Sequence, residues 1–409
     1  MGSARAFTRV PRIGKITRFR DKGNDMALHF STDELKSRRE RACAAMKQAG
    51  LDGLLIFRQE SMFYLTGYDT FGYVYFQCLY LGADGAMTLL TRAPDRLQAK
   101  ITSVIDDVRI WVDAPDAKPA EALRDILSGH GCQGKLLGVE WESYGLTARN
   151  GQRLSAALAG FCTLTDASEL VSRLRVVKSP AELAYVRRAA ELADAALAEA
   201  WRLTKPGAFE GDILAAMQGA VFRGGGDDPA NEYIIGSGPN ALLCRYVTGR
   251  RRLDADDMLT LEFAGAYRHY HSCLMRTLCV GKADPRLKDM HKACVDSLHA
   301  AEDALRPGRP IGEVFDAHAR VLDAAGHGAH RLNACGYSLG TTYAPNWMDW
   351  PMFYHGNPYV AQPGNVFFIH IIVFDDANGL AMTLGRTSEV TADGSKPLSG
   401  AALDFAVSG

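Results

Sequence analysis

Four side chains with catalytic chemistry lie in three apolar runs of the sequence. Glu262 lies in one run, His271 and Cys273 lie two residues apart in the next, and His370 lies in a third. A thiol beside an imidazole can form a thiolate nucleophile at neutral pH. A carboxylate beside them can act as a general base or orient an amidinium group. We therefore expect Glu262, Cys273, His370 and His271 to be the catalytic residues.

Two catalytic schemes fit these residues. In the first, Cys273 attacks an sp² carbon, and His370 or His271 transfers the protons. In the second, Glu262 is the base or the nucleophile and Cys273 fills the pocket wall, because a buried cysteine is more often an inert apolar side chain. A functional role for Glu262 is favoured because burying a carboxylate among apolar strand residues is costly without a partner. The alternative for each histidine is a structural residue with satisfied hydrogen bonds.

Arg245 has the chemistry of a substrate-binding residue. Its guanidinium can hold a substrate carboxylate through two parallel hydrogen bonds. The alternative is an ion pair with Asp254, Asp256 or Asp257, which follow closely in the sequence.

An aromatic run begins at Phe71 and includes Tyr73, Tyr75 and Phe76. Ring faces attract small cations, so Phe71 and Tyr73 are expected to cap a substrate cation. The alternative is packing within the N-terminal core and a dimer interface. Trp347 is expected to form another wall of the substrate pocket.

Composition limits the classes of protein to which the chain can belong. It has 409 residues, of which 47% are apolar and 23% are charged, enough for two cores. The formal net charge of −1 argues against nucleic-acid and membrane surfaces. No apolar run reaches the roughly 20 residues that span a bilayer. The nine cysteines form no CxxC pair, which indicates reduced thiols in the cytoplasm, without disulfides or a zinc site.

The chain divides into three segments. Residues 1–28 carry many arginines and are interpreted as an N-terminal extension, expected to be disordered. Residues 29–174 alternate between helical and strand patterns, which predicts an α/β domain. Residues 175–409 form the second predicted domain.

The second domain begins with a clear helix signal. Ser179-Pro180-Ala181-Glu182 supplies an N-cap, a proline at the first helical position and a glutamate at the third, and a long helix is expected to follow. Two later pairs of strand patterns, with turns at 265–268 and 375–379, predict antiparallel hairpins and hence an α+β domain.

Six motifs lie at residues 61–69, 175–183, 235–241, 262–277 (ending in Arg276-Thr277), 336–340 and 362–366. In this order they resemble the motifs of the creatinase/prolidase/aminopeptidase-P superfamily, and the resemblance covers about residues 30–398. That resemblance implies an α/β N-terminal domain followed by an α+β pita-bread catalytic domain. It also implies a homodimer in which the aromatic loop at Phe71 reaches the partner's site.

The resemblance also implies which positions would hold metal. Metal-binding members use two Asp, one His and two Glu for two divalent ions. These positions fall on Glu262, Cys273, Tyr337, His370 and about Gly385. One carboxylate in five positions is too few oxygen donors for two hard ions, so no metal and no cofactor are expected. A single zinc on Cys273, His370 and Glu262 is the alternative, and Tyr337 is assigned to substrate binding.

The likeness is closest to metal-free members such as ectoine hydrolase and creatinase. The likeness to ectoine hydrolase rests on Glu262, the run 268–271, the run 336–340 and the run 343–347, whereas the specific catalytic residues of creatinase are not found. The sequence thus predicts a metal-independent hydrolase of a non-peptide C–N bond (an amidine, guanidine or cyclic amide) in a small carboxylate-bearing compound. The alternatives are a metal-dependent Xaa-Pro dipeptidase or aminopeptidase, a lyase on the same fold, and a non-catalytic binding protein.

Overall fold

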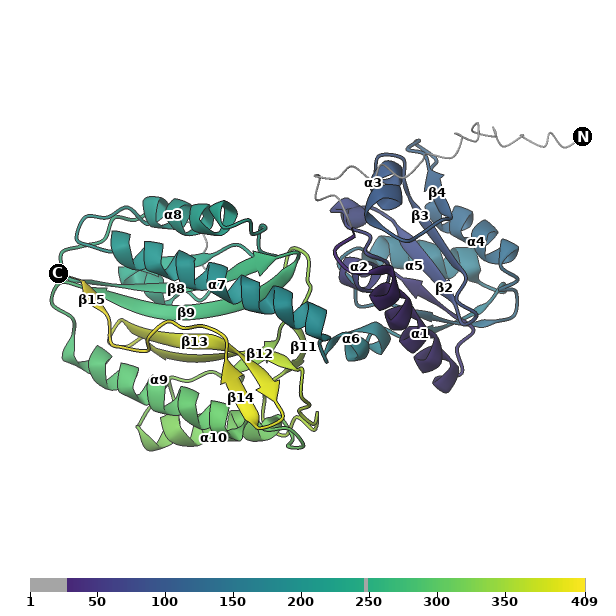
Figure 1. The fold of residues 1–409 in the computed structure, drawn as a ribbon. Helices are drawn as coiled ribbons and strands as arrows, with labels where there is room; N and C mark the ends of the chain where they lie inside the picture. Colours follow the sequence, from purple (N-terminus) through teal and green to yellow (C-terminus); the bar gives the residue numbers. More distant parts are fainter. Residues whose placement is uncertain (1–27, 246–248, 409) are drawn as a thin grey trace, which may run out of the picture.

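The computed structural model describes residues 28–245 and 249–408. The chain forms two bodies joined through α6 and α7 (Figure 1). Nearly all of the expected N-terminal extension, residues 1–28, lies outside the described residues. None of the helices in the described ranges has the length and apolar character needed to cross a bilayer.

The first body is built on a six-stranded mixed sheet in the order β4-β3-β2-β1-β5-β6. β1 pairs antiparallel with β2 and parallel with β5, so the predicted α/β domain is present. The strands are β1 (Gly53–Ile56), β2 (Cys78–Gly82), β3 (Met87–Arg92), β4 (Val108–Trp111), β5 (Leu136–Val139) and β6 (Thr163–Asp166). The helices are α1 (Thr32–Gln48), α2 (Gln59–Thr66), the short 3₁₀ helix η1 (Gly72–Val74), α3 (Asp95–Thr102), α4 (Pro119–Gly129), α5 (Ala148–Leu158) and α6 (Leu170–Arg175).

The helix signal at residue 179 forms as predicted. The Ser179 hydroxyl accepts a hydrogen bond from the Glu182 backbone, and the Glu182 carboxylate accepts one from the Ser179 backbone. This capping box opens α7 (Pro180–Leu203), which carries the chain into the second body.

The second body is built on a nine-stranded sheet with the path β11-β10-β12-β13-β9-β8-β7; β14 pairs with β13 and β15 with β9. Figure 1 shows α7 and α8 along the β8–β9 half and α9 and α10 along the β12–β13 half. The strands are β7 (Ile234–Ser237), β8 (Asp257–Tyr267), β9 (Tyr270–Val280), β10 (Gly336–Ser338), β11 (Asp349–Met352), β12 (Val366–Asp375), β13 (Leu380–Thr391), β14 (Gly394–Pro397) and β15 (Val407–Ser408). The remaining helices are α8 (Glu210–Arg223), the 3₁₀ helix η2 (Gly238–Leu242), α9 (Pro285–Ala304) and α10 (Gly312–Ala324).

The turn of the first hairpin differs from the prediction. β8 runs to Tyr267, and the reversal falls on Arg268 and His269, whose φ angles are 51° and 64°. Gly265 lies inside the strand, where an added Cβ would approach the carbonyl oxygen of Ala189 to 2.0 Å. The glycine therefore permits close packing of β8 on α7 rather than a turn.

Candidate active site

One row of paired residues crosses the sheet and places two predicted catalytic residues on one face. Glu262 on β8 pairs with Met275 on β9, Met275 pairs with Gly385 on β13, and Gly385 pairs with His370 on β12. Directly opposed residues of antiparallel strands project to the same face. Glu262 and His370 therefore share a face, and the row passes Met275 and Gly385 between them.

A hydrogen-bonded chain links three of the predicted site residues. The Tyr337 hydroxyl donates to Glu262 Oε1 at 3.1 Å, and the Trp347 indole N–H donates to the Tyr337 oxygen at 2.8 Å. Desolvation raises the pKa of Glu262 to about 7, although the Tyr337 hydrogen bond and the charge of Arg245 oppose that rise. A carboxyl with this pKa accepts and returns protons near neutral pH.

His370 lies in the same site, and its own imidazole is uncharged at neutral pH. Burial lowers its pKa to about 3, and its ring centroid is 5.6 Å from that of Tyr337. Its Nδ1 atom is buried and has no hydrogen-bond partner among the residues that the structure describes. The Nδ1 atom of His370 is therefore a buried hydrogen-bonding group that no described residue uses.

Cys273 does not have the environment of a thiolate nucleophile. It pairs with Ala264 and is fully buried, and its backbone N–H donates to the Thr387 hydroxyl at 2.8 Å. Burial raises the pKa of the thiol well above its usual value, and the charge of Glu262 raises it further. The thiol is thus protonated at neutral pH, which opposes nucleophilic attack and favours the alternative of a pocket wall.

Alkylation is expected to distinguish Cys273 from an exposed cysteine. In the native protein at pH 7.5, iodoacetamide should modify Cys244, which is exposed, and leave Cys273 unmodified because it is buried and protonated. Peptide mass spectrometry after brief labelling measures both sites in one sample. Labelling of Cys273 as fast as Cys244 would contradict the assignment of a protonated pocket-wall residue.

His271 has the bonding of a structural histidine. Its Nε2 accepts the Ala230 N–H at 2.9 Å, so Nδ1 carries the proton and faces the Thr342 hydroxyl at 3.2 Å. Burial lowers its pKa to about 4. Because both ring nitrogens are occupied, the structure opposes the predicted catalytic role of His271.

Arg245 lies at the edge of the site. Its side chain is exposed, and its charge lowers the pKa of both Glu262 and His370. The alternative ion pair is taken by another residue, since Arg251 binds Asp254 and Asp257. The expected role of Arg245 in binding a substrate carboxylate stays a prediction.

The two aromatic residues of the N-terminal loop have different surroundings. Tyr73 is buried, and its hydroxyl donates to the carbonyl oxygen of Ala344 at 2.9 Å, so it binds one domain to the other. Phe71 is 75% exposed. The expected role of Phe71 in a homodimer stays a prediction.

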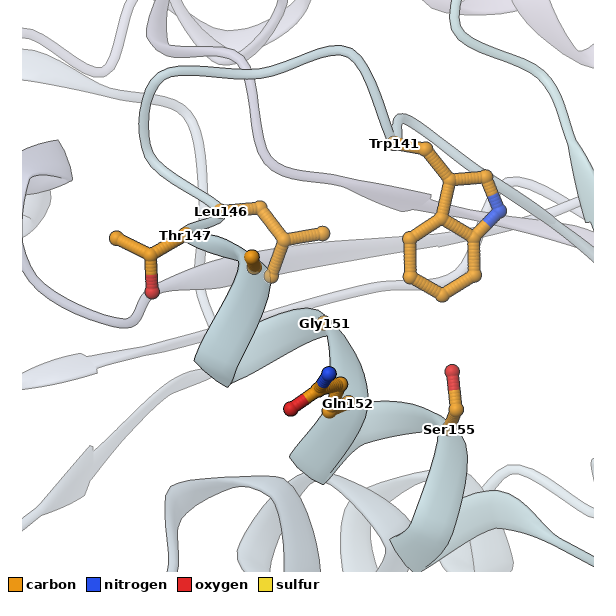
Figure 2. A pocket seen from close by; sticks show the side chains of 7 residues that line it. Trp141, Leu146, Thr147, Gly151, Gln152 and Ser155 are labelled. Carbon is orange, nitrogen blue, oxygen red and sulfur yellow. The ribbon is translucent and has the colours of Figure 1, made fainter.

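Cavities show how little space the site leaves. The cavity that Glu262 and Met275 line has a volume of about 10 Å³, room for about one water molecule. A larger hollow of about 560 Å³ lies over α5 (Figure 2), but none of its lining residues, which are Trp141, Leu146, Thr147, Ala148, Gly151, Gln152 and Ser155, has a titratable side chain. The space beside Glu262 is therefore too small for a substrate unless neighbouring side chains move.

A second polar cluster joins the hairpin tip to the N-terminal domain. Asp69 accepts hydrogen bonds from the Tyr343 hydroxyl at 3.0 Å and lies 3.0 Å from His269 Nε2. The rings of His269 and Tyr343 stack with centroids 4.3 Å apart. The sequence placed all three residues within recognised motifs, but their contact depends on the approach of the two domains.

Comparisons with known proteins identify the family. Residues 184–392 match the metallopeptidase family M24, and residues 38–177 match the creatinase/prolidase N-terminal domain. The chain belongs to the M24 family, within the creatinase/aminopeptidase-P/prolidase superfamily, and its second domain has the pita-bread fold.

Three similar proteins cover most of the chain. An uncharacterized hydrolase/peptidase of Sinorhizobium fredii is 28% identical over 93% of this chain and 99% of its own length. The ectoine hydrolase of Halomonas elongata is 26% identical over 84% of this chain and 90% of its own. The crystal structure of dipeptidase PepE from Mycobacterium ulcerans has a TM-score of 0.80 and 26% identity, covering 92% of this chain and 99% of that chain.

These comparisons contradict the predicted activity on a non-peptide bond. Besides the ectoine hydrolase, the proteins similar in sequence to this chain include several peptidases. Among them are an Xaa-Pro dipeptidase of Pyrococcus furiosus and probable dipeptidases PepE of Mycobacterium. The prediction of a metal-independent, ectoine hydrolase-like enzyme is therefore wrong as the main interpretation. The peptidase alternative fits these relatives better.

The residues present do not fit the pair of metal ions that the family implies. Within residues 28–245 and 249–408, no group of three or more His, Cys, Asp and Glu side chains is placed to hold a metal ion. Glu262 is the one carboxylate among the five family positions. One of its two oxygens already accepts the hydrogen bond from the Tyr337 hydroxyl. At Gly385, an added Cβ would lie 2.8 Å from the Ile369 carbonyl oxygen, so a glutamate there would require β12 to shift.

Proposed function

We propose that the chain hydrolyses the peptide bond of a dipeptide-sized substrate, with Glu262 as the general base. The proposal is supported by membership of the M24 family and by relatives whose names describe dipeptidases and Xaa-Pro dipeptidases. The observation that carries it is the Glu262 carboxyl, which Tyr337 orients and whose pKa is about 7.

The site residues suffice for the proton transfers of peptide hydrolysis. Ionised Glu262 takes a proton from water as the water oxygen bonds to the peptide carbonyl carbon. The same carboxyl returns that proton to the leaving nitrogen when the C–N bond breaks, which yields a carboxylic acid and an amine. Neutral His370 can hydrogen-bond the substrate, and Arg245 can pair with its terminal carboxylate.

A substrate panel tests this proposal. Full-length protein is incubated with Ala-Pro, Ala-Ala and the blocked peptide Ala-Pro-amide, each with and without Mn²⁺, and amino acids are quantified by mass spectrometry. We expect alanine to be released from a dipeptide. Release from the blocked peptide should be slower, because that peptide lacks the terminal carboxylate with which Arg245 would pair. The proposal fails if every substrate is cleaved no faster by the wild type than by E262Q in both conditions.

The pH profile should follow the ionisation of Glu262. Only the ionised carboxylate accepts a proton, so kcat/KM should rise with pH through about 7 and then level off. A single group with this pKa gives about a tenfold increase between pH 6 and pH 8. Initial rates in buffers of constant ionic strength measure the profile, and a rate that falls over this interval would exclude Glu262 as the base.

A further inference from the structure

Arg276 lies on the face of the catalytic-domain sheet that points away from Glu262. It pairs with Leu261 on β8 and with Leu384 on β13, one position along each strand from the row that contains Glu262 and Gly385. Because successive side chains alternate between faces, Arg276 projects to the face on which α7 and α9 pack. Any ligand of Arg276 would therefore bind apart from the candidate active site.

The guanidinium of Arg276 is buried with one edge unpaired. Nη1 donates to the carbonyl oxygens of Met275 and Gly385, both at 2.8 Å. Nε and Nη2 have no hydrogen-bond partner among the described residues, although the residue is only 5% exposed. Burial lowers the pKa of Arg276 to about 10, which still leaves it charged at neutral pH. A buried cation with two unused donors is costly unless an anion meets it.

A cavity of about 680 Å³ includes Arg276 in its lining. It lies between α7, α9 and the C-terminal segment, and apolar groups such as Leu197, Trp201 and Phe405 form much of its wall. This volume is within the range of small-molecule sites.

Two acidic residues, Asp194 and Asp404, line the cavity, and the one that acts on the pKa of Arg276, Asp194, is already engaged. Asp194 also lines the cavity, but its two oxygens accept hydrogen bonds from the Ser399 hydroxyl and the Gly400 N–H. Asp194 thus fixes the C-terminal segment as a wall of the cavity, and its charge only raises the pKa of Arg276 from a distance. Nε and Nη2 of Arg276 are therefore left without an anionic partner among the described residues.

We propose that this cavity binds a small carboxylate with an apolar or aromatic body. Nε and Nη2 form the side of a guanidinium whose two parallel N–H groups match both oxygens of one carboxylate. The apolar wall accommodates the body of the ligand. This site is separate from the proposed peptidase site, and its test does not depend on activity.

Calorimetry with benzoate and its neutral, nearly isosteric analogue benzamide tests the proposal. Benzoate should bind the full-length protein with a dissociation constant in roughly the millimolar range or below. Benzamide should bind at least about tenfold more weakly, because it lacks the charge that Arg276 requires. The absence of saturable benzoate binding, or equal binding of benzamide, would overturn the proposal.

Three variants locate the site. R276M should weaken benzoate binding at least about tenfold, whereas R306M, which changes an exposed arginine of another surface, should not alter it. A198F places a ring in the cavity from an exposed position on α7 and should also abolish binding, even if R276M fails to fold. Unchanged affinity in folded R276M or in A198F would show that benzoate does not bind in this cavity.

Discussion

E262Q should lower kcat/KM for a cleaved dipeptide by on the order of 10²–10⁴-fold, the usual contribution of a general base. Glutamine has the size of glutamate, and its carbonyl oxygen can still accept the Tyr337 hydrogen bond. It cannot take a proton from water. The loss should therefore appear in kcat, with KM little changed, in steady-state assays of purified protein at pH 8.

Y337F is the matched control for the E262Q experiment. Removing the hydroxyl of Tyr337 leaves the Glu262 carboxylate able to accept a proton. It also removes a hydrogen bond that lowers the pKa of Glu262. The midpoint of the pH profile should consequently move above 7, while the rate at high pH stays within a few-fold of the wild type. If E262Q retains a third or more of the wild-type kcat/KM, Glu262 is not the base.

D349A should destabilise the protein by about 3–5 kcal/mol, because it leaves a buried cation without its counter-ion. Asp349 on β11 forms an ion pair with Arg175 at the end of α6, and the two side chains are 7% and 2% exposed. An arginine cannot shed its proton at neutral pH to avoid this cost. A drop in melting temperature on the order of 10 °C is expected in differential scanning fluorimetry.

The buried lysine beside this pair should respond differently. Burial lowers the pKa of Lys178 to about 8, while the charge of Asp349 opposes that effect. Without Asp349, Lys178 can lose its proton, so Arg175 accounts for most of the loss in stability.

Two further variants separate burial of charge from loss of a contact. D316A removes one partner of an exposed pair with His355 and should change the melting temperature by less than about 2 °C. The double variant R175M/D349L removes both buried charges and should recover most of the stability lost in D349A. A melting temperature of D349A equal to that of D316A would contradict the importance of the buried pair.

The fold could be predicted in outline because its signals are local. The capping box at Ser179 and Glu182 depends on residues three positions apart, and the strand patterns of β8, β9, β12 and β13 are visible in the sequence. The turn predicted at Gly265 is wrong, since a glycine that permits close approach to Ala189 cannot be distinguished in the sequence from one that permits a turn.

The candidate site was predicted only in part. The chemistry of Glu262, Tyr337, Trp347 and His370 was recognised, and these residues do lie together. The role first considered for Cys273 depended on a thiolate, and the degree of burial that keeps the thiol protonated is a property of the packed sheet.

By itself, the sequence determined the order of the elements, the two domains and which residue types stand at the five family positions, because covalent order and hydrophobic spacing are contained in it. Only the tertiary structure decided which groups are charged and which donors are left unpaired. Desolvation acts on Glu262 and Arg276 through neighbours distant in the chain, so their pKa values and partners emerge only when the strands and helices pack together.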